Sequence, residues 1–202
     1  RADGRAVAVV APRCPSGPPD VAVLDRHAVE LDRFVAPGPG TVAGFAWHGE
    51  RLLISTERRL LALTIGDTAA TLLTAADRLS APAVARDGRV VTAAEKRLHL
   101  LAADLSETSM VDLAVAPRAL SFAATGDRLV GLVGDARGHT EVVVLRLPDG
   151  EHRVLTKNDR EERAPQFNPR GDRIYFETRG TDPVLPARTL SRIASLPVPA
   201  DV

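Results

Sequence analysis

The densest charged stretch of the chain, residues 157–163, reads Lys-Asn-Asp-Arg-Glu-Glu-Arg. Two of its side chains, those of Arg160 and Arg163, could each grip a carboxylate through two parallel hydrogen bonds. A run of charges is also typical of a solvated surface loop that has no function. We take Arg160 and Arg163 as candidate partner-binding residues, with a plain surface loop as the alternative.

The segment from Arg179 to Arg188 is a second candidate recognition element. It contains Thr-Asp-Pro at positions 181–183 and a further proline at 186. Prolines restrict the unbound chain, which lowers the entropy cost of binding. Arg179 and Asp182 are the candidate partner-binding residues of this loop, and an idle surface loop is the alternative.

Local catalytic and metal-binding motifs are absent from the sequence. The histidines stand at positions 27, 48, 99, 139 and 152. None has the His-x-x-x-His or His-Glu-x-x-His spacing of a zinc site, so we expect them at solvated or edge positions. There is no Gly-x-Ser-x-Gly or Ser-x-x-Lys motif for a serine nucleophile, and the prolines of Pro37–Gly40 remove amide donors that a phosphate would need. We predict no catalytic residue, no metal and no cofactor.

Composition narrows the classes of partner. The 202 residues, 45% of them hydrophobic, suffice for a single all-β domain. Basic and acidic residues balance at 26 each and aromatic residues make up 3%, so neither long-range attraction nor base stacking favours nucleic acid. No apolar run is long enough to span a membrane. A single cysteine, Cys14, can form neither an internal disulfide nor a cysteine-based zinc site.

A recurring turn organises the chain that carries these residues. Its copies are Asp3-Gly4-Arg5, Gly49-Glu50-Arg51, Asp87-Gly88-Arg89, Gly126-Asp127-Arg128 and Gly171-Asp172-Arg173. The arginines are spaced by 46, 38, 39 and 45 residues, with alternating, strand-like segments between them. A turn that repeats at roughly 40 residues without helical periodicity is typical of a β-propeller, in which each repeat forms one four-stranded blade.

The turn in the fifth copy has residues suited to a tight hairpin. Asn168 can accept hydrogen bonds from the backbone that follows it, Pro169 fixes φ, and Gly171 tolerates a positive φ. An aromatic residue stands four positions before the glycine in three copies: Phe45, Phe122 and Phe167. We expect these rings to lie wedged between neighbouring sheets.

Residues 162–176 resemble the WD40-like repeat of the TolB type (PD40), whose consensus is Glu-x-Pro-x-Trp-Ser-Pro-Asp-Gly-Lys-x-Ile-x-Phe. The identical positions are Pro169, Gly171, Ile174 and Phe176. The replaced positions are Phe167 for Trp, Asn168 for Ser, Arg170 for Asp and Asp172 for Lys. The resemblance is specific in this repeat and only skeletal in the other four. It implies a propeller of the kind found in bacterial envelope proteins and in some peptidases, and hence a periplasmic or cell-envelope location.

The strand pattern divides residues 1–202 into five units of one propeller domain, approximately 1–40, 41–77, 78–117, 118–161 and 162–202. The first unit lacks an innermost strand and the last an outermost one. We therefore expect a segment of a propeller with six to eight blades, the others coming from the parent chain or another subunit. A self-contained five-bladed disc is the alternative.

Two functions remain open. The first is a non-catalytic module that holds a protein or peptide partner on its loop face. The second is the propeller domain of a larger enzyme, such as a gated serine peptidase or a propeller hydrolase. The expected inner strands are almost wholly apolar or small, which favours binding over catalysis because a channel enzyme needs converging polar groups.

Overall fold

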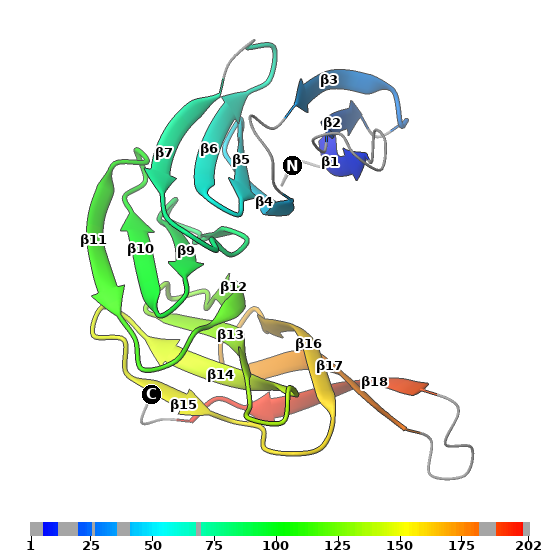
Figure 1. Ribbon diagram of the computed structural model, residues 1–202, viewed down its shortest axis with the longest axis vertical. Coiled ribbons are helices and arrows are strands. Elements are labelled where there is room, and N and C mark those ends of the chain that lie inside the picture. The colour runs from blue at the N-terminus through cyan, green and yellow to red at the C-terminus, as the bar shows by residue number, and fades with distance from the viewer. Residues whose placement is uncertain are drawn as a thin grey trace.

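In a computed structural model, the chain forms five antiparallel β-sheets that follow one another around an open arc (Figure 1). The structure describes residues 6–11, 20–25, 27–35, 41–67, 70–181 and 189–199, and within these it contains strands and turns but no helix. The predicted all-β propeller architecture is confirmed. Because the arc is open, these residues do not form the closed five-bladed disc that was the alternative.

The strands of each sheet are consecutive in the sequence. The first sheet consists of β1 (Ala6–Ala11), β2 (Asp20–Asp25) and β3 (Glu30–Val35). The second consists of β4 (Val42–His48), β5 (Arg51–Thr56), β6 (Arg59–Thr64) and β7 (Thr71–Ala75). The third consists of β8 (Ala83–Val84), β9 (Val90–Ala94), β10 (Arg97–Leu101) and β11 (Glu107–Asp112).

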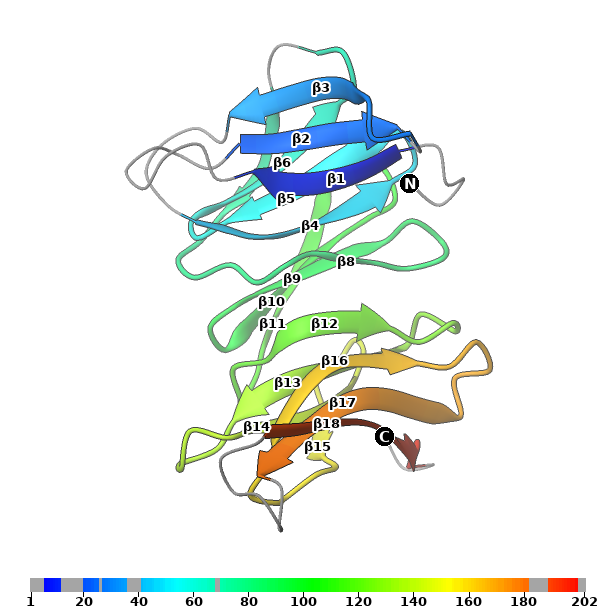
Figure 2. The same ribbon diagram turned by 90° about the vertical axis from the view of Figure 1, so that its right-hand side faces the viewer.

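The fourth sheet consists of β12 (Arg118–Phe122), β13 (Arg128–Gly134), β14 (Thr140–Arg146) and β15 (His152–Val154). The fifth consists of β16 (Glu161–Phe167), β17 (Arg173–Thr181) and β18 (Thr189–Pro197). The strands β4, β8, β12 and β16 lie on the concave side of the arc (Figure 2). We had expected the inner strands to be almost wholly apolar or small. This is wrong for β16, because the strand includes the charged residues 161–163.

The predicted turn recurs with the same backbone geometry. Gly88, Gly126 and Gly171 have φ values of 90°, 74° and 75°, which an L-residue rarely adopts. In each turn the glycine N–H donates to the carbonyl oxygen three residues earlier. The side chain of Asn168 accepts hydrogen bonds from the N–H groups of Asp172 and Arg173, at 3.1 and 3.2 Å, so it spans the whole turn.

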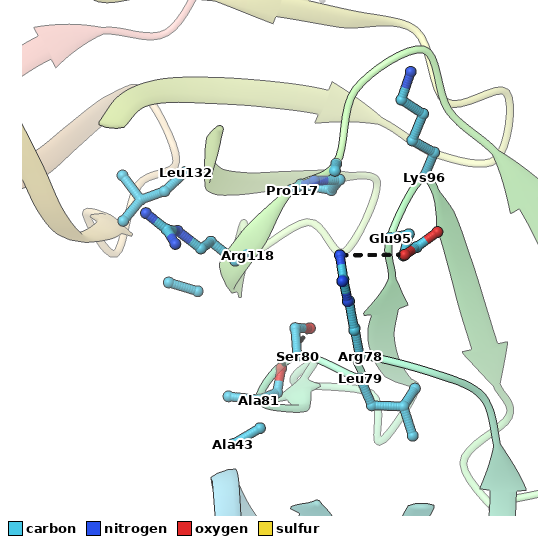
Figure 3. Close-up of a pocket in the computed structure, with 12 residues that line it drawn as sticks. Ala43, Arg78, Leu79, Ser80, Ala81, Glu95, Lys96, Pro117, Arg118 and Leu132 are labelled. Atoms are coloured by element: carbon cyan, nitrogen blue, oxygen red, sulfur yellow. Dashed lines mark hydrogen bonds and ion pairs between the residues drawn. The ribbon is translucent and has the colours of Figure 1, made fainter. Parts of the chain in front are cut away.

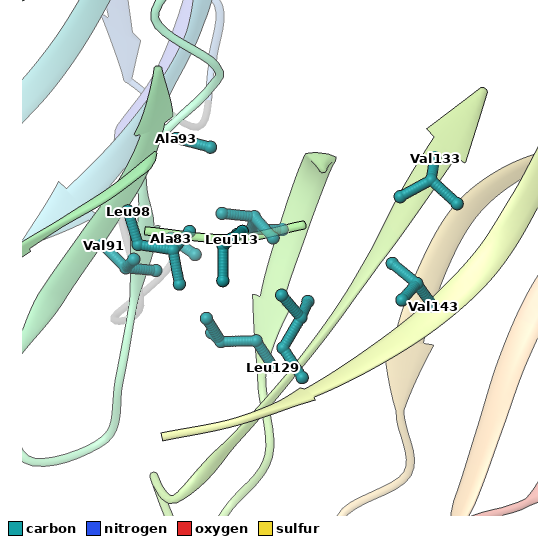
Figure 4. Close-up of a cluster of buried hydrophobic side chains, with 10 residues drawn as sticks. Ala83, Val91, Ala93, Leu98, Leu113, Leu129, Val133 and Val143 are labelled. Atoms are coloured by element: carbon teal, nitrogen blue, oxygen red, sulfur yellow. The ribbon is translucent and has the colours of Figure 1, made fainter. Parts of the chain in front are cut away.

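Central strands present apolar side chains to both neighbouring sheets, because successive residues of a strand point to opposite faces. In β13, Leu129 packs with buried residues of the third sheet, whereas Val130 packs with buried residues of the fifth. Figure 4 shows Val91 and Leu98 of the third sheet facing Leu129 of the fourth across one of these interfaces. The continuous apolar runs in the sequence are thus strands that are buried on both faces.

The three phenylalanines lie at these interfaces but are only partly buried. Phe45 packs at the interface of the first and second sheets, Phe122 at that of the third and fourth, and Phe167 at that of the fourth and fifth. The predicted location is correct, but the fully buried residues of the interfaces are the aliphatic ones of the second and third strands.

Neighbouring sheets are also joined through their repeated turns. His48 Nε2 lies 2.9 Å from the carbonyl oxygen of Gly88, and Arg89 Nη2 donates to the carbonyl oxygen of Gly126 at 2.9 Å. Each contact joins one sheet to the turn of the next.

His99 does not lie at a solvated or edge position, as we had expected for the histidines. It is only 5% exposed, and its Nδ1 lies 2.7 Å from Glu107 Oε1. None of the described residues forms a helix long and apolar enough to cross a bilayer.

Candidate partner-binding face

Two cavities open where the sheets meet, and both are lined by the same kinds of segment. These are the connections from one sheet to the next and the hairpins between the second and third strands of a sheet. We call the surface formed by these segments the loop face. It is the part of a propeller in which the sequence analysis placed function, and irregular segments on a rigid scaffold commonly carry binding residues.

The first cavity, the inner cavity, has a volume of about 700 Å³ and lies among the second, third and fourth sheets. Ala43 of β4 and Arg118 of β12 contribute to its wall. Arg78 and Glu95, from two adjoining segments on its third-sheet side, form an ion pair with 3.5 Å between Nη1 and Oε1 (Figure 3). Both of these side chains are well exposed, so solvent screens the pair and leaves it open to exchange with a charged partner.

The second cavity, the lysine cavity, has a volume of about 680 Å³ and lies between the third and fourth sheets. Lys96 from the β9–β10 hairpin and Lys157 from the β15–β16 connection line it from opposite sheets. These are the only lysines in the sequence. Arg137 of the β13–β14 hairpin also lines the cavity and pairs with Asp135, Nε to Oδ2, at 3.4 Å.

The loop face carries an excess of unpaired positive charge. Its cations without an ion pair to any described residue are Lys96, Arg118, Lys157 and Arg160. Its acidic side chains are mostly engaged or buried: Glu95 and Asp135 are paired with arginines, and Glu141 is only 3% exposed. Carboxylates of the same segments, Glu57, Asp77 and Asp159, offset part of this charge, so the four cations can each bind an anion but do not make the whole face strongly positive.

Burial would raise the pKa of the Asp135 carboxyl, but two backbone N–H groups outweigh it. The N–H groups of His139 and Arg137 each donate to Oδ1 at 2.8 Å and hold the pKa below its ordinary value. The carboxylate is therefore charged at neutral pH and fixes the β13–β14 hairpin at the edge of the lysine cavity.

The structure brings together two of the predicted site residues. Arg163 of β16 donates to both oxygens of Glu161, at 2.9 and 3.0 Å, and Arg179 of β17 donates to Glu177 at 2.6 Å. Arg163 is the β-ladder partner of Glu177, so the four side chains form one network on a single face of the fifth sheet. Both guanidinium groups already have a carboxylate, and a partner's acid would have to compete for them.

The carboxyl of Glu177 lies at the centre of this network. The Ser191 hydroxyl, which donates to Oε1 at 2.6 Å, and then Arg179 lower its pKa below the ordinary value. Because every member is already paired, this network can hold the strands of the fifth sheet in register without a ligand.

The other two predicted residues stand apart from this network. Arg160 precedes β16, and its side chain lies over Gly180, where a Cβ would be 3.3 Å from Arg160 Cγ. Its guanidinium makes no ion pair with a described residue and belongs to the loop face. Asp182 lies outside the residues that the structure describes.

Sequence reasoning missed the cations of the two cavities. These cations are Arg118, which begins an inner strand, and the two lysines, Lys96 and Lys157. The signal was present: Lys96 and Lys157 both fall in segments of the kind that the propeller interpretation assigned to the loop face. Within the residues described, no group of three or more His, Cys, Asp or Glu side chains is arranged to hold a metal ion.

Solved structures with the same fold cover most of this chain. Hydrazine synthase from Kuenenia stuttgartiensis matches 90% of it, and 58% of its own length, at 14% identity with a TM-score of 0.71. TolB from Acinetobacter baumannii matches 97% of it and 52% of its own length, at 14% identity with a TM-score of 0.67. KlHsv2, with its loop 6CD replaced by a Gly-Ser linker, matches 86% of it and 57% of its own length, at 12% identity with a TM-score of 0.60.

No family model matches the sequence, and no curated protein does. The TolB repeat assignment therefore has no support from a family model, although TolB itself is among the similar structures. The chain spans between 52% and 58% of the three matched structures. Since the identities are only 12–14%, the similarity shows the fold alone: this chain is an arc of β-propeller blades.

Proposed function

We propose that the chain is a non-catalytic binding module that holds an acidic segment of a protein or peptide partner against its loop face. The observation that carries this proposal is a set of three cations, without ion pairs to a described residue, in the lining of two cavities, Lys96, Arg118 and Lys157, with Arg160 in the same connection as Lys157. Electrostatic complementarity of this kind steers a partner and orients it. The exposed Arg78–Glu95 pair can open to give a fifth contact.

The proposal includes a bacterial periplasmic or cell-envelope location and further blades from the parent chain or another subunit. Its support is the resemblance of residues 162–176 to the TolB-type repeat, together with the structural similarity to TolB. Fractionation of cells that express the full parent protein tests the location, and a cytosolic pool alone would contradict it.

A propeller domain of a larger enzyme remains the second candidate, because one similar structure is named hydrazine synthase. Gated peptidases and propeller hydrolases are the forms of this candidate that the sequence suggested. It predicts that the parent protein hydrolyses a generic peptide or ester substrate. The binding-module proposal predicts no turnover above that of a heat-denatured control.

The direct test uses a fluorescein-labelled peptide of alternating aspartate and serine, with a lysine–serine peptide as the charge control. Fluorescence anisotropy should show binding of the acidic peptide only, weakened by added salt. Arg118→Met should weaken it about two- to fivefold, as expected for an exposed ion pair, whereas Arg86→Met, in a turn at the opposite end of the third sheet, should leave it unchanged. Equal binding of the two peptides, or no binding of either, would overturn the proposal.

A further inference from the structure

His99 of β10 has one ring nitrogen held by a carboxylate and the other without a partner. Its Nδ1 lies 2.7 Å from Glu107 Oε1. A carboxylate oxygen accepts hydrogen bonds, so Nδ1 carries the proton and Nε2 keeps its lone pair. No described residue makes a hydrogen bond to Nε2, and Nε2 is not among the buried atoms that lack a partner. This nitrogen therefore reaches the surface, although His99 as a whole is only 5% exposed.

The residue directly opposite His99 in the third sheet is Met110. The strands β10 and β11 are antiparallel neighbours (Figure 1), and His99 pairs with Met110 in their register. Directly opposite residues have Cβ atoms about 4.5–5.5 Å apart on one face of a sheet, which lets an imidazole and a thioether reach one common ion. Met110 is the only methionine of the sequence and is 57% exposed, so packing of the core does not require a thioether here.

Both side chains line a pocket of about 520 Å³ between the second and third sheets, which we call the histidine pocket. Its wall includes the end of β7 as well as β10 and β11. The charged side chains in and around this pocket balance. The carboxylates are Asp77, Glu95, Glu107 and Asp112, and the cations are Lys96 and Arg97 of the wall together with Arg58 and Arg78, which pair with Asp77 and Glu95. Balanced charges give a divalent ion little attraction and a monovalent ion little repulsion.

The two candidate ligand atoms favour one kind of metal. A thioether is a soft ligand that selects Cu(I), and imidazole also binds copper. Oxygen ligands, which Mg²⁺ and Ca²⁺ prefer, are not part of this pair. A histidine ligand needs its other ring N–H held by an acceptor, which fixes the tautomer and the orientation of the ring. Glu107 supplies that acceptor for His99.

We propose that His99 Nε2 and Met110 Sδ bind Cu(I) in the histidine pocket, with Glu107 as a positioning residue for the imidazole. This site goes beyond partner binding at the loop face, because its ligand is a metal ion. The sequence analysis predicted no metal, since no histidine has the spacing of a zinc site within one segment. The pair is formed instead across two strands, and one of its ligands is a sulfur atom.

Titration with Cu(I), kept reduced by ascorbate in the absence of oxygen, tests the proposal. All samples carry Cys14→Ser, because a thiolate would compete for the ion. An isotope-labelled methionine methyl group gives a single NMR signal, that of Met110, which should move and saturate. Competition with a chromophoric Cu(I) chelator should give a Kd of about 10 μM or tighter, and Zn(II) should bind at least tenfold more weakly. A methyl signal that stays unchanged in excess Cu(I) would overturn the proposal.

Four variants locate the site. Met110→Leu keeps a side chain of similar size at an exposed position, so folding is preserved, and it should weaken Cu(I) binding at least tenfold. His99→Gln should do the same, whereas His152→Gln, on the outer strand of the fourth sheet, should change nothing. Unchanged affinity in Met110→Leu, or an equal loss in His152→Gln, would refute the site even if His99→Gln failed to fold.

The fourth variant tests the positioning role. Glu107→Leu removes the acceptor for the His99 Nδ1–H, so NMR of the ring nitrogens should show both tautomers, and Cu(I) binding should weaken about tenfold. A single unchanged tautomer would contradict this role of Glu107.

Discussion

Two isoleucines on opposite faces of the fifth sheet offer a matched test of the interface between blades. Ile174 of β17 is 0% exposed and packs against the fourth sheet, whereas Ile193 of β18 is 74% exposed. Each can be replaced by alanine, which removes the same three carbon atoms. The difference between the two variants therefore reports burial and nothing else in the chemistry of the substitution.

The magnitude follows from the burial of Ile174. Loss of three buried carbon atoms costs about 2.4 kcal/mol at about 0.8 kcal/mol per methylene, and a residual cavity brings the total to about 3–4 kcal/mol. For a chain of 202 residues this lowers Tm by roughly 6–16 °C. The exposed Ile193→Ala should change the free energy of unfolding by about 0.5 kcal/mol or less.

Thermal unfolding followed by circular dichroism, supported by urea titration, measures both variants against the unchanged protein. Equal losses of stability would refute the reasoning, because they would mean that both faces of the fifth sheet are buried in solution. A negligible loss for Ile174→Ala would refute it as well, since the fourth and fifth sheets would then not pack through this residue.

Three further predictions concern the turns, an aromatic anchor and a charged network. Phe167→Ala should cost about 1–3 kcal/mol in urea unfolding, because the ring is only partly buried; a larger loss would indicate deeper packing. A serine hydroxyl and an arginine lower the folded-state pKa of Glu177, so its contribution to stability is present above the ordinary value of 4.5 and is lost as pH falls through the lower folded pKa. The Tm values of the unchanged protein and Glu177→Gln should therefore converge in acid, and parallel Tm curves would contradict this. Gly126→Ala and Gly171→Ala should each cost about 1–2 kcal/mol for their positive φ. Gly126→Ala should cost slightly more, because its Cβ would displace the Arg89 guanidinium and break the hydrogen bond that this group donates to the Gly126 carbonyl oxygen, whereas Gly171 has nothing within 4 Å; equal losses in chemical denaturation would count against the Arg89 contact.

Much of the fold could be predicted because its signals are local. The glycine turn and the alternation of apolar residues on either side of it depend on neighbouring positions, and the positive φ of Gly171 follows from residue type. The burial of β13 on both faces was not predicted, because it depends on the packing of the third and fifth sheets against the fourth. The start of β16 could not be predicted, because the charges of Glu161 and Arg163 resemble those of a loop until their β17 partners are known.

The candidate site was harder to predict because its residues come from different sheets. Lys96 and Lys157 lie far apart in sequence and meet only through the packing of the third sheet on the fourth. In the same way, nothing in the sequence around Glu141 shows that this residue of an apolar strand is buried beside a cavity. Arg163 and Arg179 were predicted as candidate partner-binding residues, but each already donates to a carboxylate two positions away on its own strand.

Amide NMR of the isotope-labelled protein, recorded during titration with the aspartate–serine peptide, tests the partner-binding proposal most directly. We expect shifts at Arg78, Lys96 and Arg118 on the loop face that saturate with the peptide. Gly88 and Gly126, in turns at the opposite end of the third and fourth sheets, should stay unchanged. Shifts confined to those turns, or no shifts at peptide excess, would contradict a partner-binding loop face.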